Sequence, residues 1–309
     1  MFEERVLPHP GTAWVLRTFR GPGGGTRLLT GGSDVVRAWD PATGEQVTVF
    51  DADWPGTHDF IVCHPRGRTP VLAVSTEYGV WWHDALTGEE LGRDESVDDT
   101  VAGMSVARMR DGTLTLFGAG FLGPFTVHRW DAATRQPLPD LGSHDDHIVA
   151  VSAIEVPGRD PIVLATGWSK VIYRWDPATG SQIGPPLAGH ESIVHWMRAV
   201  TLADGRTLLA TGDSAGEVRR WDPLTGEPVG TPIQAHPGSA TVLPLRVGDH
   251  AHLLTSGDDE VVRRWDALTG ELLDEPAAGF GPVLLSIGGE QAIATGGRGG
   301  VRIARLRLT

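Results

Sequence analysis

The sequence is short of cysteine, of lysine and of positive charge in general, and each shortage excludes a class of protein. Cys63 is the only cysteine among 309 residues, so the chain has no disulfide framework and no cysteine-ligated metal site. Lysine occurs once, at Lys170. Acidic residues outnumber basic ones by 39 to 26, which gives a formal net charge of −13. Because nucleic-acid binding needs a basic surface or stripe, we expect no nucleic-acid partner.

Long apolar runs are missing as well. No apolar run approaches the length of about 20 residues that a membrane-spanning helix needs. The first ten residues, MFEERVLPHP, lack the basic start and the apolar stretch of a secretory signal peptide. We therefore expect no membrane association and a cytoplasmic location, which a single cysteine fits. Arginine in place of lysine, with abundant alanine, glycine and proline, favours a bacterial origin.

The sequence contains one motif that is repeated along its whole length. A short apolar stretch ends in an aromatic residue followed by Asp, and a turn such as PATG, ALTG or AATR comes next. A seventh, degenerate copy ends at Ala304-Arg305. Recurrence at a fixed period of this length indicates a repeat architecture. The six dipeptides begin, at steps of 44 to 47 residues, at Trp39, His83, Trp130, Trp175, Trp221 and Trp265.

The period, the closing Trp-Asp and a histidine upstream of most repeats resemble the WD40 family, and the resemblance covers essentially the whole chain. It implies an all-β fold, a seven-bladed WD40-type β-propeller in a single domain. We place the N-terminal strand in the last blade, because residues 282–308 hold only three strand signals and this closure removes an exposed sheet edge. The expected blades are 8–52, 53–93, 94–141, 142–187, 188–234, 235–277, and 278–309 with 2–7.

The resemblance also implies a hydrogen-bonded set inside each blade, made of the upstream His, a Ser or Thr, an Asp and the closing Trp. Ser, His and Asp also form hydrolase triads. A trio that recurs from blade to blade is better explained as interior bracing, because buried polar groups must be paired. The sets are His9, Thr30, Asp34 and Trp39 in blade one; His190, Thr211 and Trp221 in blade five; and His236, Ser256, Asp258 or Asp259, and Trp265 in blade six.

Some positions depart from the repeat. Blade two has Trp81-Trp82 ahead of its His-Asp, blade three offers Asp98 or Asp99 in place of the upstream His, and blade seven has neither His nor Trp. Weak blades are either tolerated in a closed ring or form a docking side. Arginine precedes the closing Trp at Arg129, Arg174, Arg220 and Arg264. We favour a structural role, with stems along neighbouring blades and heads paired to Asp, over an anion-binding ring.

In WD40 propellers partners usually bind the top face, formed by the loop before each first strand and the hairpin between the second and third strands. Exposed aromatic residues are enriched in interaction hot spots, so those on the top face are candidates for partner contact. The opposing interpretation is that the tryptophans pack between blades and the histidines are merely solvated. Two histidines without a third ligand do not make a metal site, and we expect no metal or cofactor. The predicted contact residues are Thr12, Trp14, Thr100, His147, Trp168, His195 and Thr241.

The function expected from the resemblance is a non-catalytic protein–protein interaction scaffold that binds a partner on the top face. The alternative is a small-molecule-binding or catalytic propeller with a pocket at the top mouth of the channel, where His147 or His195 would act as acid or base. The sialidase Asp-box, the P-loop and the kinase motifs are absent from the sequence. We therefore do not expect an enzyme, although fold alone does not fix function.

Overall fold

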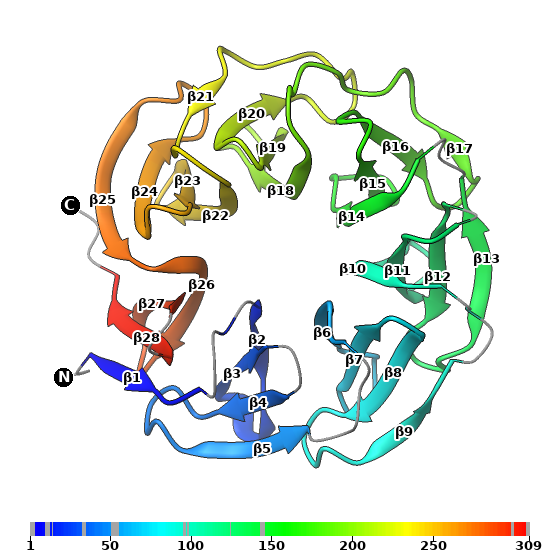
Figure 1. The fold of residues 1–309 in the computed structure, drawn as a ribbon, viewed down its shortest axis with the longest axis vertical. Coiled ribbons are helices and arrows are strands. Elements are labelled where there is room, and N and C mark those ends of the chain that lie inside the picture. The colour runs from blue at the N-terminus through cyan, green and yellow to red at the C-terminus, as the bar shows by residue number, and fades with distance from the viewer. Residues whose placement is uncertain are drawn as a thin grey trace.

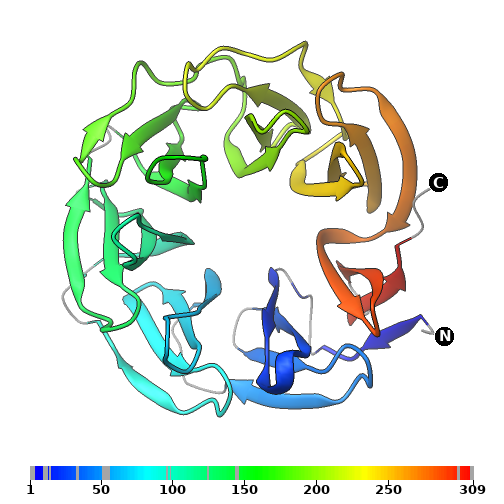
Figure 2. The same cartoon turned by 180° about the vertical axis from the view of Figure 1, so that it is seen from behind.

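In the computed structural model the described residues, which are 4–9, 13, 15–32, 35–50, 56–94, 97, 99–123, 125–142, 146–297 and 300–306, form seven four-stranded antiparallel sheets. The sheets stand around a central axis like the blades of a propeller (Figure 1), and the view from behind shows the same closed ring (Figure 2). The prediction of an all-β, seven-bladed propeller is confirmed. No helix in this part of the chain is long and apolar enough to cross a membrane.

The first four blades run in chain order around the ring. Blade one contains β2 (Val15–Arg20), the 3-10 turn η1 (Pro22–Gly24), β3 (Thr26–Gly31), β4 (Val36–Trp39) and β5 (Gln46–Phe50). Blade two contains β6 (Asp59–Cys63), β7 (Val71–Thr76), β8 (Gly79–Asp84) and β9 (Glu90–Arg93). Blade three contains β10 (Val101–Arg108), β11 (Leu114–Gly120), β12 (Val127–Asp131) and β13 (Pro137–Leu141). Blade four contains β14 (Ile148–Ile154), β15 (Ile162–Gly167), β16 (Ile172–Asp176) and β17 (Ser181–Gln182).

The last three blades complete the ring. Blade five contains β18 (Val194–Thr201), β19 (Thr207–Asp213), β20 (Glu217–Trp221) and β21 (Ile233–Gln234). Blade six contains β22 (Thr241–Val247), β23 (His250–Ser256), β24 (Val261–Asp266) and β25 (Leu272–Ala278). Blade seven contains β26 (Phe280–Ile287), β27 (Glu290–Gly297), β28 (Gly300–Arg305) and the N-terminal β1 (Arg5–Leu7). β1 pairs antiparallel with β28, so the N-terminal strand closes the last blade as predicted.

The turn after each closing dipeptide is built by its Asp. In blade one a side-chain oxygen of Asp40 accepts hydrogen bonds from the backbone N–H groups of Ala42 and Thr43, and Gly44 ends the turn at a φ of 80°. Blade three has Arg135 at the glycine position, with a φ of 63°. A side chain in this left-handed region is strained, whereas glycine is not. The turn is therefore unstrained in five blades, whereas the turn of blade three contains a strained, left-handed Arg135.

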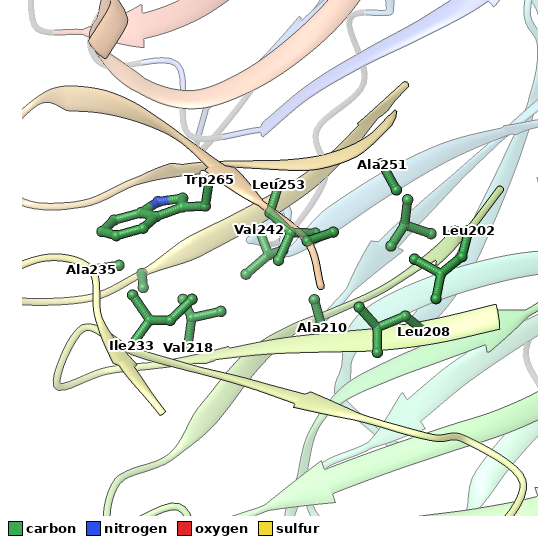
Figure 3. Packing of buried hydrophobic residues seen from close by; sticks show 13 residues of the cluster. Leu202, Leu208, Ala210, Val218, Ile233, Ala235, Val242, Ala251, Leu253 and Trp265 are labelled. Carbon is green, nitrogen blue, oxygen red and sulfur yellow. The ribbon is translucent and has the colours of Figure 1, made fainter. Parts of the chain in front are cut away.

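Apolar clusters fill the spaces between neighbouring blades. Figure 3 shows the cluster between blades five and six, where Trp265 of β24 lies beside Ile233 and Val218 of blade five. The closing Trp of four other blades packs in the same way against apolar residues of the preceding blade. Trp39 packs on blade seven, Trp130 on blade two, Trp175 on blade three and Trp221 on blade four.

In blades three, four and five the arginine before the closing Trp reaches the other way, to the following blade. Arg174 is buried and donates hydrogen bonds to the backbone carbonyls of Pro223 and Leu224 in the next blade's turn. Arg220 does the same to Leu268 and Arg129 to Pro177, in the corresponding turns of blades six and four.

Pairing of the arginine heads with Asp, as predicted from the sequence, is correct only for Arg264, which bonds Asp274. For Arg129, Arg174 and Arg220 the prediction is wrong, because their heads lie against backbone carbonyl groups of turns. The idea of an anion-binding arginine ring does not fit this geometry, since the guanidinium heads of Arg129, Arg174 and Arg220 lie against backbone carbonyl oxygens.

Replacing Arg220 by Ala should lower the free energy of unfolding by about 3 kcal/mol, because it opens a cavity and leaves buried carbonyl oxygens without donors. The midpoint of urea unfolding, followed by circular dichroism, measures the effect. Arg206→Ala is the matched control, since Arg206 is exposed in a hairpin and its loss should change stability by less than about 0.5 kcal/mol. Equal midpoints for the two variants would contradict the structural role of the buried arginines.

Replacing Arg135 by Gly should raise the free energy of unfolding by about 0.5–1 kcal/mol, because it relieves the left-handed backbone at that turn. Gly44→Ala is the mirror experiment at the same turn position of blade one and should lower it by about 1 kcal/mol. Thermal unfolding of both variants gives the two signs. A loss of stability in Arg135→Gly would show that the side chain makes contacts worth more than the strain.

Candidate functional site

The top face lies at the end of the blades where the hairpins between second and third strands emerge. In three consecutive blades this hairpin exposes one large apolar side chain. Tyr78, between β7 and β8, is 56% exposed; Leu122, between β11 and β12, is 63% exposed; and Trp168, between β15 and β16, is 50% exposed. We call these three residues the apolar arc. Apolar side chains gathered on one face mark an interaction site more often than apolar side chains scattered singly.

An aromatic cluster supports Trp168 at one end of the apolar arc. The cluster consists of Phe121, Phe125, His147 and Trp168. The ring of His147 is central: its centroid lies 4.3 Å from that of Trp168, 4.9 Å from that of Phe121 and 4.8 Å from that of Phe125. The Nδ1 of His147 is hydrogen-bonded to the backbone carbonyl of Phe121. The structure therefore brings the predicted residues His147 and Trp168 together and adds two phenylalanines from the blade-three hairpin.

His195 lies elsewhere, on the channel side of blade five. It lines a cavity with His58 and Val149 and is exposed to that space. Burial among its neighbours lowers the pKa of His195, and the charge of Asp213 opposes the shift. His147 and His195 belong to different surroundings and do not form an acid–base pair. The aromatic cluster and the channel are thus two separate candidate sites.

The other predicted contact residues are less accessible. Thr241 is buried, because it stands directly opposite Ser256 in the β22–β23 pair and their hydroxyls are 2.7 Å apart. The prediction of an exposed contact at Thr241 is therefore wrong. Thr100 is half-buried, with its hydroxyl 3.4 Å from the backbone carbonyl of Glu77. Thr12 and Trp14 lie outside the described residues, as do Asp34 of blade one and Asp98 of blade three.

The predicted bracing set of blade five is present as a chain of hydrogen bonds. Trp221 donates its indole N–H to Thr211 Oγ1 over 3.0 Å, and Thr211 Oγ1 lies 2.8 Å from His190 Nε2. His190 Nδ1 lies 2.9 Å from a carboxylate oxygen of Asp213. Since an indole only donates and a carboxylate only accepts, the histidine proton belongs on Nδ1. These groups brace the blade interior.

Glu217 completes a cluster in which His190, Asp213 and Glu217 offer ligand atoms within 4.8 Å of one another. The same atoms already have partners, because Nδ1 of His190 faces Asp213 and Glu217 accepts a hydrogen bond from Arg219. The geometry is that of a brace whose acids are both hydrogen-bonded.

Blade six contains a set of the same kind, with two corrections. His236 bonds Thr255 and Asp259, each at 2.8 Å, and Trp265 donates to Thr255 at 2.9 Å. The predicted member Ser256 is wrong, and of the two predicted alternatives Asp258 and Asp259 the structure has Asp259. Leu253 stands opposite Trp265, so the residue two places on, Thr255, shares the Trp face of β23, while Ser256 points to the other face. In blade one Trp39 donates to Thr30 over 2.9 Å, as predicted.

Blade three replaces the usual set by one that sequence reasoning missed. His128 of β12 lies 3.2 Å from Asp99 on one side and 3.2 Å from Asp140 on the other. Gly118 and Gly120 occupy the places that Thr and Asp take in blade five, and a Cβ on Gly120 would come within 3.0 Å of Asp99 and His128. Asp99 also accepts a hydrogen bond of 2.6 Å from the backbone N–H of Leu122, and so holds part of the apolar arc.

The charge of His128 follows from this position. Burial alone would lower its pKa, but the hydrogen bonds and negative charges of Asp140 and Asp99 outweigh burial and raise the pKa of His128 to about 9. The pKa of Asp140 falls in turn, since its bonds to His128 outweigh the opposing effect of burial. At neutral pH the brace is an ion triad.

Comparison with known proteins adds the fold alone. No family model matches the sequence, and no curated protein matches it either. Among solved structures the chain is similar to the computationally designed Ika8 protein, with a TM-score of 0.64 and 17% sequence identity over 97% of this chain and 98% of that one. At this identity the similarity establishes the propeller architecture and says nothing about activity or partners.

The ion triad of blade three predicts a pH-dependent stability. The folded pKa of about 9 lies above the ordinary value of 6.5, so the stabilisation is complete below pH 6.5 and is lost as the pH rises through 9. Between pH 7 and pH 10 the wild type should lose on the order of 2 kcal/mol more than the His128→Gln variant, which cannot titrate there. Urea midpoints across that range test this, and parallel pH profiles would contradict it.

Proposed function

We propose that this chain is a non-catalytic scaffold of the WD40 type that binds a protein partner on its top face, over blades two to four. The single observation that carries the proposal is the apolar arc, in which Tyr78, Leu122 and Trp168 are each at least half exposed on consecutive hairpins. Solvent-exposed apolar and aromatic side chains on a rigid frame are favourable anchors for a partner, because they bury area at little cost in conformational entropy.

The WD40 assignment is supported by the repeated Trp-Asp turns and by the His-Thr-Trp sets of blades five and six. The aromatic cluster supports the choice of Trp168 as the anchor. His147 and Phe121 hold one side of the indole ring while half of it stays exposed. An anchor that is held in place before binding loses little freedom when the partner arrives.

A bacterial and cytoplasmic protein is part of the same proposal. The free thiol of Cys63 is buried, and burial raises its pKa to about 12, so it is a poor nucleophile and a poor disulfide partner. This is compatible with a reducing compartment. We propose no cofactor and no nucleic-acid or membrane partner, on the grounds of the charge balance and composition.

The alternative function, a propeller that binds a small molecule at the channel mouth, has one observation in its favour. Cavities in the channel are lined by charged side chains and by His195. Binding there would leave the apolar arc free, so the two functions are compatible and can be tested separately.

The face is tested by paired variants. Leu122→Ser with Trp168→Ser should reduce capture of a partner from lysate of the native host at least about tenfold, which corresponds to the loss of hot-spot contacts. Leu224→Ser with Leu268→Ser is the matched control, because these leucines are 47% and 48% exposed in turns at the opposite end of blades five and six. Circular dichroism verifies that both variants fold.

Cross-linking through the single lysine tests where on the protein the partner binds. Lys170 lies in the same hairpin as Trp168 and is exposed, so an amine-reactive cross-linker has one side chain on which to act, besides the N-terminus. We expect the captured partner to be cross-linked to Lys170 and to lose this link in Lys170→Arg. Equal loss of capture in both paired variants, or capture with no link at Lys170, would contradict binding over blades two to four.

A further inference from the structure

The channel holds two arginines at equivalent positions of blades one and five. Arg17 stands opposite Leu29 and Arg198 opposite Ala210, each one residue beyond the partner of the closing Trp. Both side chains line the same two cavities, of about 300 and 380 Å³. The innermost strands that carry them, β2 and β18, lie on different sides of the central opening (Figure 1).

Asp59 is the only acid among the described residues that line these two cavities. It is fully engaged: one oxygen pairs with Arg17 over 2.8 Å and accepts the backbone N–H of Phe60, and the other accepts the N–H of Met104. Among the described residues no carboxylate pairs with Arg198 in this way, and its hydrogen bond goes to the neighbouring carbonyl of Met197. One positive charge in the channel is therefore left without a counter-charge on the cavity walls.

The surroundings of Arg198 disfavour the charged form of its guanidinium group. Burial inside the ring, together with the like charge of Arg17, lowers the pKa of Arg198 to about 10, with Asp59 opposing. Its head lies 5.6 Å from the ring of Trp196, which packs against the core of blades five and six and so fixes the guanidinium over the cavity. A guanidinium held in this way has donors still facing the channel.

We propose that the cavity of about 300 Å³ binds a small phosphate group between Arg17 and Arg198. The site would suit a phosphate because guanidinium forks match its oxygens and because a desolvated anion repays the cost of the uncompensated charge. His58 and His195 line the same cavity and offer further donors. The cavity of about 300 Å³ admits inorganic phosphate or the phosphate end of a small metabolite.

This site is independent of the proposed scaffold function. Arg17 and Arg198 lie on innermost strands, whereas the apolar arc lies on the hairpins between second and third strands. Partner capture can therefore fail while phosphate binding succeeds, and the reverse.

Isothermal titration calorimetry with inorganic phosphate, at constant ionic strength set by chloride, tests the proposal. The wild type should bind one phosphate per chain with a saturable isotherm. Arg198→Met keeps the stem of the side chain and removes the charge, and should weaken binding at least about tenfold. Arg206→Met is the matched control, because it removes an exposed arginine and should leave the affinity within about twofold.

A second ligand and a second variant complete the experiment. Glycerol 3-phosphate in place of inorganic phosphate distinguishes a metabolite site, which binds it more tightly, from a site for the free ion, which binds it less tightly. Should Arg198→Met fail to fold, Arg198→Lys keeps one charge without the planar fork and is expected to bind several-fold more weakly than wild type. The absence of saturable phosphate binding by the wild type, or equal affinity in the wild type and the Arg198 variant, would overturn the proposal.

Discussion

Alternation along the third strand of each blade holds the ring together. Neighbouring residues of a strand point to opposite faces of the sheet, and in a propeller one face meets the preceding blade and the other meets the following blade. The closing Trp thus packs backward, as Trp221 does on blade four, while the arginine before it reaches forward, as Arg220 does to Leu268. Blades three, four and five have both contacts and are fixed from both sides, so a blade with an atypical interior can be retained in the ring.

Two of the atypical blades, two and three, carry residues of the apolar arc. In blade three, Asp99 braces His128 and holds the backbone N–H of Leu122, so a single carboxylate serves the interior and the surface. In blade two the hairpin presents Tyr78, and in blade four it presents Trp168. The proposed docking surface therefore includes atypical blades two and three, whereas blade seven, which also departs from the repeat, contributes no residue to the apolar arc.

Features that repeat could be predicted from the sequence, and features that occur once could not. The ring, its closure by β1 and the His190–Thr211–Trp221 set follow from a pattern read many times over. The prediction that Ser256 belongs to the blade-six set was wrong because a shift of one residue moves a side chain to the other face of the strand. The repeat period does not determine the pairing register to that precision. The sequence did not predict that Arg17 and Arg198 share a site. They are 181 positions apart and line the same cavity only because the ring closes.

The central claim is that the top face over blades two to four is where a partner binds. Hydroxyl-radical footprinting of the captured complex against the free protein tests it most directly, because oxidation reports the solvent exposure of each side chain. We expect protection of Tyr78, Leu122 and Trp168 in the complex, with Leu224 and Leu268 oxidised as in the free protein. Protection of Leu224 and Leu268, with the apolar arc still oxidised, would contradict it.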